Sequence, residues 1–287
     1  MARAHDYTVD ELICACIARQ LTDGEVVAQG IATPLVMSGY LLAKHTHAPH
    51  LQFASAIGNA LIRDPAPLGL ARVEELWLGQ ALLRLGFAQA ACELLPRFRP
   101  KEFFRPAQID SCGNFNNVAI GVDYHRPQLR LPGCGGIADV TPYYDQIHLY
   151  VPRHSRAVFV PQVDFVSGVG CSAARPAGAG PCYLVSDLGQ FDFAMGRMRL
   201  TACHPGMSVE KIQARTGFPL QIAPQVGQTE PPTPEELRLL REVIDPLGVR
   251  RLEVASGSQR KHILREILAA EGCLTDLERT SPPAPGL

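Results

Sequence analysis

The order of apolar and polar residues predicts a chain in which helices and strands alternate. Thr8 and Glu11 have the T-x-x-E form of a capping box, and the apolar residues that follow at helical spacing predict a helix over about 8–21. The next segments predict a short strand within 25–32 and a helix over 34–44 that begins at its proline. Such alternation is typical of an open, largely parallel α/β sheet flanked by helices.

The rest of the chain continues this pattern with more strands. A helical pattern covers residues 73–95, and residues 99–110 are expected to form a loop that enters another strand. Further β-rich segments are expected at 113–121, 146–151 and 157–168, and two hairpins around 187–189 within 182–204. Helices are expected to begin at Ser208 and Thr233 and to cover 258–270. Residues 172–182 are expected to form a mobile or partner-covered loop. We therefore expect one α/β domain over residues 1–252 and a C-terminal helix with a flexible tail over residues 253–287.

Composition and charge exclude several classes of protein. The chain has 287 residues, of which 46% are apolar and 19% are charged, as expected for a soluble globular protein. Its 27 basic and 28 acidic residues create no net field toward nucleic acid or anionic membranes. The sequence has no apolar signal core and no 18-residue apolar run, and its nine cysteines show no C-x-x-C spacing. These features predict free thiols and a cytoplasmic location.

Two motifs resemble cofactor sites without completing them. His45, His47 and His50 form an H-x-H-x-x-H run, but no further ligand motif accompanies it, so a solvated loop is favoured over a zinc site. Residues 133–138 satisfy G-x-G-x-x-A, yet the ribose-binding acid expected after the next strand is missing from 148–156. We expect no metal and no cofactor. The glycines instead predict a loop whose backbone N–H groups approach a ligand oxygen, as in an oxyanion hole.

The strand predicted at residues 51–56 ends in a glycine turn at Gly58, a usual place for a reacting side chain, but no acid, base or thiol stands there. Ser55 is a candidate nucleophile, although a hydrogen-bonded serine at a strand end is the more common case. Cys134, within the glycine loop, is the one thiol with a plausible role beyond core packing. No G-x-S-x-G elbow is present.

Six segments, in sequence order, resemble the B subunit of glutaconate CoA-transferase, a class I CoA-transferase. They are residues 10–49, 107–121, 126–139, 156–170, 184–193 and 233–246. The resemblance implies an α/β domain that pairs with a homologous A subunit in a heterodimer or heterotetramer. It also implies an acyl-CoA site at the junction of the two subunits.

The resemblance places Ala56 where the transferases have the glutamate that attacks the thioester, because "AIG" stands here in place of "ESG". A methyl group forms no acyl anhydride, so the family's transferase mechanism is not expected from this chain. The alanine is either the natural residue or a replacement of a cysteine. The glycine loop matches the family's G-S-G-G segment, with cysteine in place of serine. The expected site therefore combines Ala56 and Ser55 at the catalytic position with the substrate-binding residues Phe53, Asn114, Asn116, Gly133, Cys134, Gly135 and Gly136.

An unsaturated acyl-CoA with a distal carboxylate loses CO₂ without a cofactor when its electrons delocalise into the thioester. The sequence pattern resembles the two-subunit 3-methylglutaconyl-CoA decarboxylase of an alternative isovaleryl-CoA route, in which the family's acid is exchanged for cysteine. Decarboxylation of 3-methylglutaconyl-CoA is therefore the expected function. Three alternatives stay open: a ring-opening acyl-CoA hydrolase, a transferase with another nucleophile, and a non-catalytic scaffold subunit.

Overall fold

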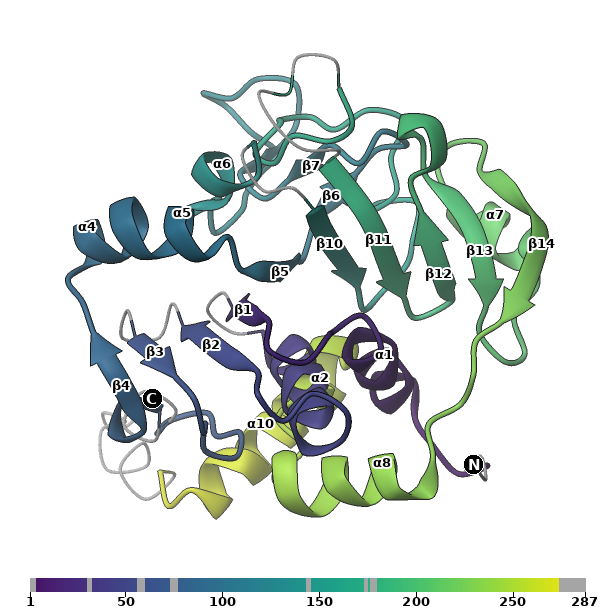
Figure 1. Cartoon of the computed structure of the whole chain (residues 1–287). Helices are drawn as coiled ribbons and strands as arrows, with labels where there is room; N and C mark the ends of the chain where they lie inside the picture. The colour runs from purple at the N-terminus through teal and green to yellow at the C-terminus, as the bar shows by residue number, and fades with distance from the viewer. Residues whose placement is uncertain are drawn as a thin grey trace, which may run out of the picture.

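A mixed β-sheet crosses the molecule with the strand order β14-β13-β12-β11-β10-β5-β1-β2-β3-β4 (Figure 1). The computed structural model describes residues 4–29, 33–55, 60–72, 77–142, 146–172, 175 and 180–273. The strands of the sheet are β1 (Val26–Gln29), β2 (Gln52–Ser55), β3 (Ala60–Ile62), β4 (Ala81–Arg84), β5 (Lys101–Phe104), β10 (Gln146–Val151), β11 (Gly180–Ser186), β12 (Gly189–Asp192), β13 (Arg199–Cys203) and β14 (Gln221–Gln228). The central strands, from β11 through β10, β5 and β1 to β2, run parallel, as predicted for this α/β class.

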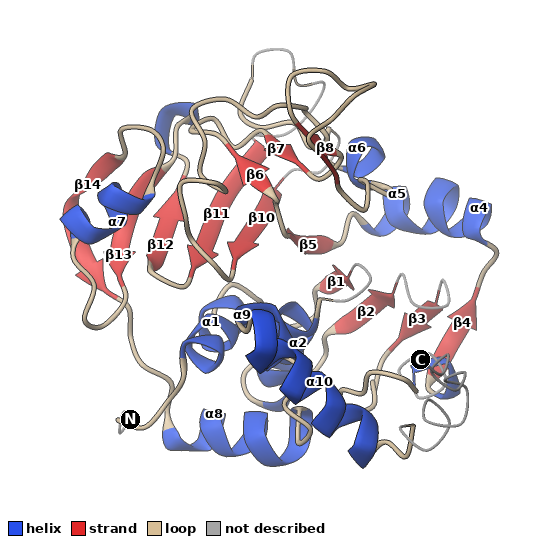
Figure 2. Ribbon diagram, turned by 180° about the vertical axis from the view of Figure 1, so that it is seen from behind, coloured by secondary structure: helices blue, strands red, loops and turns tan. Residues whose placement is uncertain are grey.

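Helices lie on the faces of the sheet, and two small hairpins form separate two-stranded sheets (Figure 2). The hairpins pair β6 (Gln108–Ile109) with β7 (Phe115–Asn116) and β8 (Ala119–Ile120) with β9 (Leu129–Arg130). The helices are α1 (Val9–Ala18), α2 (Pro34–His45), α4 (Phe87–Gln89), the π-helix η1 (Ala90–Leu94), α5 (Leu95–Phe98), α6 (Ile137–Val140), the 3₁₀-helix η2 (Ala194–Gly196), α7 (Val209–Arg215), α8 (Pro234–Arg238), the π-helix η3 (Leu239–Ile244), α9 (Arg251–Val254) and α10 (Gly257–Ala270).

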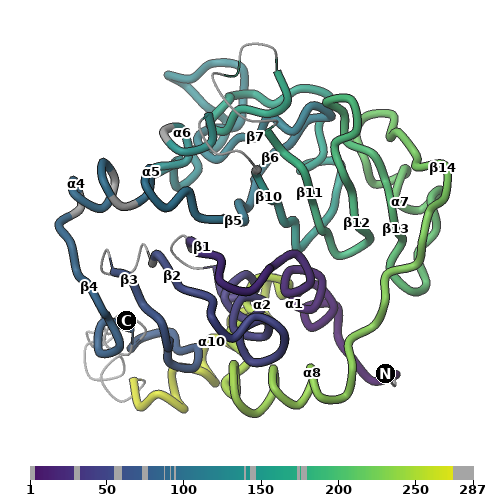
Figure 3. Tube along the Cα trace, viewed as in Figure 1, coloured from purple at the N-terminus to yellow at the C-terminus, as the bar shows by residue number. Residues whose placement is uncertain are grey.

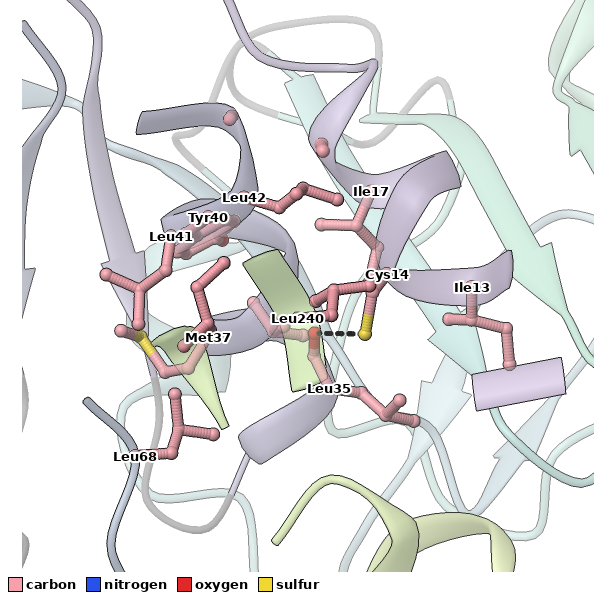
Figure 4. Packing of buried hydrophobic residues seen from close by; sticks show 14 of the residues in the cluster. Ile13, Cys14, Ile17, Leu35, Met37, Tyr40, Leu41, Leu42, Leu68 and Leu240 are labelled. Carbon is pink, nitrogen blue, oxygen red and sulfur yellow. Dashed lines mark hydrogen bonds between the residues drawn. The ribbon is translucent and has the colours of Figure 1, made fainter. Parts of the chain in front are cut away.

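The largest hydrophobic core lies between α1, α2 and one face of the sheet. Alternate residues of the strands point into it, including Val27, Phe53 and Phe103. Figure 4 shows side chains of α1 and α2 packed together in this core, and the Cys14 Sγ donates a hydrogen bond of 3.5 Å to the carbonyl of Leu35. Ile263 and Ile267 of α10 belong to the same cluster, so the C-terminal helix packs against the core of the main domain.

β5 joins the two halves of the sheet through two register pairs on each side. It pairs with β1 at Lys101 and Glu102 and with β10 at Phe103 and Phe104. The trace in Figure 3 runs from β4 at the edge of the sheet through α4 and α5 and returns to β5 at the centre. The four-residue strand β5 is therefore the link between the two halves of the sheet.

The Tyr40 hydroxyl lies where β1 and β5 stop pairing. It donates a hydrogen bond of 3.0 Å to the carbonyl of Ala28 and accepts one of 3.2 Å from the N–H of Phe103. A side chain of α2 thus occupies the place of a strand-to-strand hydrogen bond. The described residues of β1 and β5 pair only at two positions because of this insertion.

Most elements predicted from the sequence are confirmed. The N–H of Thr8 donates to the Glu11 carboxylate at 2.9 Å, as expected for a capping box at the start of α1. α2 begins at Pro34, α7 follows Ser208, and α8 begins with a second capping box at Thr233. The hairpins β11–β12 and β12–β13 and the helix α10 also lie where the pattern places them.

Three predictions of secondary structure are wrong. The helix expected over 73–95 is interrupted by β4, because pairing with β3 outweighs the helix propensity of its Ala-Leu-Leu-Arg sequence. The loop expected over 99–110 contains β5, which lies between Pro100 and Pro106, and β6, which begins two residues after Pro106. The strand expected over 157–168 forms only isolated bridges, at Phe159 and Gly168. β3 and β14 were not predicted.

Several predictions fall outside the described residues: the turn at 56–59, most of the loop at 172–182, and the tail beyond 273. Among the helices that the structure describes, none has the length and apolar composition needed to cross a bilayer.

The Tyr40 hydroxyl generates a first prediction. Tyr40→Phe leaves the Ala28 carbonyl and the Phe103 N–H without this partner, so we expect it to lower the free energy of unfolding by about 1–3 kcal/mol. Urea denaturation of the assembled complex measures the change. Tyr7→Phe is the matched control, because Tyr7 packs against the same core and no hydrogen bond of its hydroxyl is found in the described structure. Equal stability of the two variants would contradict the bridging role.

Candidate functional site

The carboxyl ends of the parallel strands β1, β2 and β5 meet at one edge of the sheet, where open α/β sheets bind ligands. Ser55, the last residue of β2, pairs in register with Gln29. Ala56 follows it directly in the sequence and lies outside the described residues. The Phe53 side chain is buried in the hydrophobic core between the sheet and the helices α1 and α2. Its ring lies edge-on to the ring of Trp77, with 5.8 Å between the ring centroids. The structure therefore places Phe53 in the core.

Two alanines and one glutamate form a row on the face of these strands that is opposite to the α1–α2 core. Ala54, Ala28 and Glu102 are in register across β2, β1 and β5, so their side chains share one face. Leu85 and Leu95 pack against the two alanines from the segment that contains α4 and α5. The row thus combines apolar surroundings with a single carboxyl group.

The glycine loop has backbone groups that face open space. Gly133 and Gly135 have positive φ angles of 107° and 50°, which side chains other than that of glycine rarely adopt. A Cβ atom added at Gly133, Gly135 or Gly136 would meet nothing within 4 Å. The N–H groups of Cys134, Gly135 and Gly136 have no backbone acceptor in the described structure. These donors are suited to bind a carbonyl or oxyanion oxygen.

Asn117 fastens this loop to the end of β5. Its carbonyl accepts a hydrogen bond of 2.9 Å from the N–H of Gly133. Its side-chain amide donates to the carbonyl of Arg105 at 3.0 Å and accepts from the N–H of Ala107 at 2.8 Å. Because Arg105 directly follows β5, the glycine loop is held at the carboxyl end of the strand that carries Glu102.

α6 confirms on which face the loop lies. This helix follows the glycines, and its Ile137 and Val140 pack against the second hydrophobic cluster, which includes Phe104. Phe104 and Glu102 are two residues apart on β5, so their side chains point to the same face. The glycine loop, held at the carboxyl end of β5, therefore leads into a helix that packs against the cluster containing Phe104, on the face of β5 to which Glu102 points.

The predicted binding residues Asn114 and Asn116 take part in a network inside the neighbouring loop. The Asn114 amide donates to Asp110 at 2.9 Å. Asn116 is buried, donates to Gln108 at 2.8 Å and accepts from the N–H of Val118 at 2.9 Å. These bonds shape the turn that leads to Asn117, and through it they support the glycine loop.

The remaining candidates do not converge on this edge. His47 contacts the carbonyl of Leu21, and His50 contacts Asp23 at 2.8 Å. Within the part of the chain that the structure describes, no group of three or more His, Cys, Asp or Glu residues is arranged to hold a metal ion. Cys134 is half-exposed in the glycine loop.

The sequence pattern does not single out Glu102, the carboxyl group of this row. Its side chain is half-buried, and desolvation raises the pKa of its carboxyl to about 7 from an ordinary value of 4.5. No hydrogen bond or ion pair to this carboxyl is found among the described residues. The signal in the sequence was an acid within the aromatic run "EFF", which would have indicated an inward-facing carboxyl if the run had been assigned to a strand.

Comparison with curated proteins places the chain beside the B subunits of known two-subunit enzymes. It is 31% identical to the B subunit of glutaconate CoA-transferase from Acidaminococcus fermentans over 263 residues, which cover 86% of this chain and 96% of that protein. It is 32% identical to the IpdB subunit of the cholesterol ring-cleaving hydrolase from Rhodococcus jostii, covering 81% of this chain and 90% of that one. No protein-family model matches the chain.

Comparison with solved structures adds a decarboxylase. The structure superposes on "the decarboxylase AibA/AibB" with a TM-score of 0.76 and 31% identity, covering 88% of this chain and 100% of that chain. A variant of the same decarboxylase with one cysteine replaced by alanine matches with a TM-score of 0.75 and 32% identity. At 32% identity this chain is a different protein from that variant, so its alanine at position 56 does not derive from that replacement.

The glycine loop generates a second prediction. Gly133→Ala puts a side chain at a φ of 107°, so we expect the loop to shift and the affinity for CoA thioesters to fall at least tenfold. Calorimetric titration of the assembled complex with an acyl-CoA measures this affinity. Gly206→Ala is the control, because Gly206 has a φ of 82° and open space around it but lies in the turn before α7. Equal loss of affinity in both variants would show that the effect is general strain.

Proposed function

Because this chain belongs to the family of glutaconate CoA-transferase B subunits, we propose that it is the B subunit of a two-subunit enzyme that decarboxylates 3-methylglutaconyl-CoA to 3-methylcrotonyl-CoA. One observation carries the proposal: alanine occupies the position of the family's nucleophilic glutamate, while the glycine loop keeps its bare N–H groups. The site thus retains a means to polarise a thioester and lacks the group that attacks it. Similarity to a decarboxylase structure supports this choice of reaction.

The reaction needs electrostatic stabilisation more than it needs a nucleophile. When the bond between the distal carboxylate and its neighbouring carbon breaks, CO₂ leaves and the electron pair delocalises through the double bond onto the thioester oxygen. The N–H groups of Cys134, Gly135 and Gly136 would hold this oxygen as its negative charge develops. A proton delivered to the carbon that lost CO₂ then completes the product.

The surroundings of the site favour departure of a carboxylate. Ala28, Ala54, Leu85 and Leu95 form an apolar cluster, which solvates a carboxylate poorly. A glutamate at position 56 would add a second negative charge beside the substrate carboxylate. Alanine at that position removes the repulsion and leaves room for the acyl group.

The partner follows from the relatives. The similar solved structure is a complex of two different subunits, AibA and AibB, and the glutaconate CoA-transferase relative is likewise named as one subunit. We therefore expect that this chain alone is inactive and that an A subunit completes the junction at which acyl-CoA binds. Co-expression of the two chains should give a stable hetero-oligomer.

A hydrolase is the second candidate, because one relative at 32% identity is a subunit of a ring-cleaving hydrolase. A hydrolase would draw its carboxylate from the A subunit and release an acid by adding water. A decarboxylase would release CO₂ and keep the thioester. The product therefore distinguishes the two functions.

The third prediction is this product. The co-purified pair, incubated with 3-methylglutaconyl-CoA, should form 3-methylcrotonyl-CoA and CO₂ in equal amounts, with no acetyl-CoA formed when acetate is added. Mass spectrometry of the CoA esters and trapping of CO₂ measure both products. This chain incubated without the A subunit is the control and should give no turnover. Free CoA as the main product would favour the hydrolase.

The fourth prediction concerns position 56. Ala56→Glu should lower CO₂ release by orders of magnitude, because two carboxylates about 4 Å apart repel by several kcal/mol at an effective dielectric near 20. Ala56→Cys is the matched control and should retain CO₂ release, because a thiol is small and uncharged. Both variants are assayed as assembled complexes with the same substrate. Unchanged CO₂ release by Ala56→Glu would show that residue 56 does not line the reacting centre.

A further inference from the structure

The proposed decarboxylation requires a proton donor near the acyl group, and the position of Glu102 in the sheet suits this role. Glu102 lies on the central strand β5, and β1 separates it from β2, the strand that ends at Ser55. In the sheet register it is aligned with Ala28 and Ala54. Two strand spacings of about 4.8 Å separate the backbones of Ala54 and Glu102, roughly 10 Å in all. An acyl group that lies along this row would reach both.

The charged residues nearest to Glu102 along β5 are engaged on the other face of the sheet. Lys101 forms an ion pair with Glu25 at 2.8 Å, and Arg105 forms one with Glu253 at 2.9 Å. On the adjacent strand β10, His148 packs against the ring of Phe103, which points into the α1–α2 core. Glu102 therefore has no cation beside it within the described residues, and its surroundings favour the neutral acid.

Among its described side chains, the covering segment provides no partner for this carboxyl either. Leu85 and Leu95 pack over the row, whereas the charged residues Glu93 and Arg97 of the same segment are exposed. A carboxyl group in such a setting costs stability, because it is desolvated without compensation by a hydrogen bond, and groups perturbed in this way are typical of functional sites.

We infer that Glu102 is the proton donor of the reaction, which delivers its carboxylic proton to the carbon from which CO₂ departs. This inference rests on the proposed decarboxylation. As the carbon–carbon bond breaks, the electron pair passes into the thioester and forms a dienolate. The bond from the Glu102 oxygen to hydrogen then breaks, a carbon–hydrogen bond forms, and the resulting carboxylate takes a proton from water. The substrate anion and one proton yield the product and CO₂, so the step needs no further reactant.

The geometry divides the work between two groups on the same face of the sheet. The N–H groups at Cys134, Gly135 and Gly136 hold the thioester oxygen at one end of the conjugated system, and Glu102 protonates the other end. Asn117 fixes the glycine loop to the residue after β5, so both groups are positioned from the same strand.

The experiment compares Glu102→Gln and Glu102→Asp in the assembled complex with wild type. Glutamine keeps the shape but carries no acidic proton, so we expect kcat to fall on the order of 10²–10⁴-fold, with partial recovery by aspartate. Glu266→Gln on α10, exposed and remote from the row, is the control and should keep wild-type kcat. Size-exclusion chromatography checks that every variant assembles with the A subunit.

The pH profile supplies a readout that a purely structural role would not change. Because the pKa of Glu102 is raised to about 7, its protonated form is depleted as the pH rises through that value. The wild-type kcat should therefore fall above about pH 7, and the residual activity of Glu102→Gln should lack this decline.

Two results would overturn the inference in distinguishable ways. CO₂ release by Glu102→Gln within twofold of wild type, with the same pH profile, would remove Glu102 from the reaction and leave the proposed function intact. Absence of CO₂ release from the wild-type pair would overturn the proposed function and this inference with it. Loss of assembly in both Glu102 variants, with normal kcat for the remaining complex, would assign Glu102 to the subunit contact instead.

Discussion

β5 is held in the sheet by its pairing with two neighbouring strands, and this pairing sets how the two halves of the sheet are joined. Two register pairs hold it to β1 and two hold it to β10. Through these pairs the half of the sheet that leads to position 56 meets the half that carries the hairpins β11–β12 and β12–β13. Since a short ladder contributes few hydrogen bonds, the side chains around β5 must fix its position.

Four side chains perform this task on the α1–α2 face. The Tyr40 hydroxyl connects Ala28 to Phe103 between the strands. The buried Glu253 carboxylate accepts hydrogen bonds from the N–H of Leu35 at the start of α2 and, at 2.9 Å each, from Tyr150 of β10 and from Arg105 after β5. Burial raises the pKa of Glu253, and these three donors satisfy its oxygens. One face of the sheet thus anchors β5, and the Glu102 side chain points to the opposite face.

The sequence predicted those features that local pattern controls and missed those that depend on tertiary pairing. Capping boxes at Thr8 and Thr233, the proline that opens α2, and the hairpins around 187–189 follow from neighbouring residues and were correct. β4 and β5 were missed because their stability comes from partner strands that are distant in sequence. The glycine loop was recognised from its composition. Glu102 was not, because its significance appears only when β5 is placed at the centre of the sheet.

Asn117 shows how the glycine loop is restricted by a residue outside it. Both polar atoms of its side chain are engaged, the amide nitrogen with the carbonyl of Arg105 and the oxygen with the N–H of Ala107. An aspartate could not donate to that carbonyl, and an aliphatic residue would satisfy neither group. Sequence drift at position 117 is therefore limited by the geometry needed at Gly133, sixteen positions along the chain. Such a constraint fixes the place of the bare N–H groups of the glycine loop independently of the residue that stands at position 56.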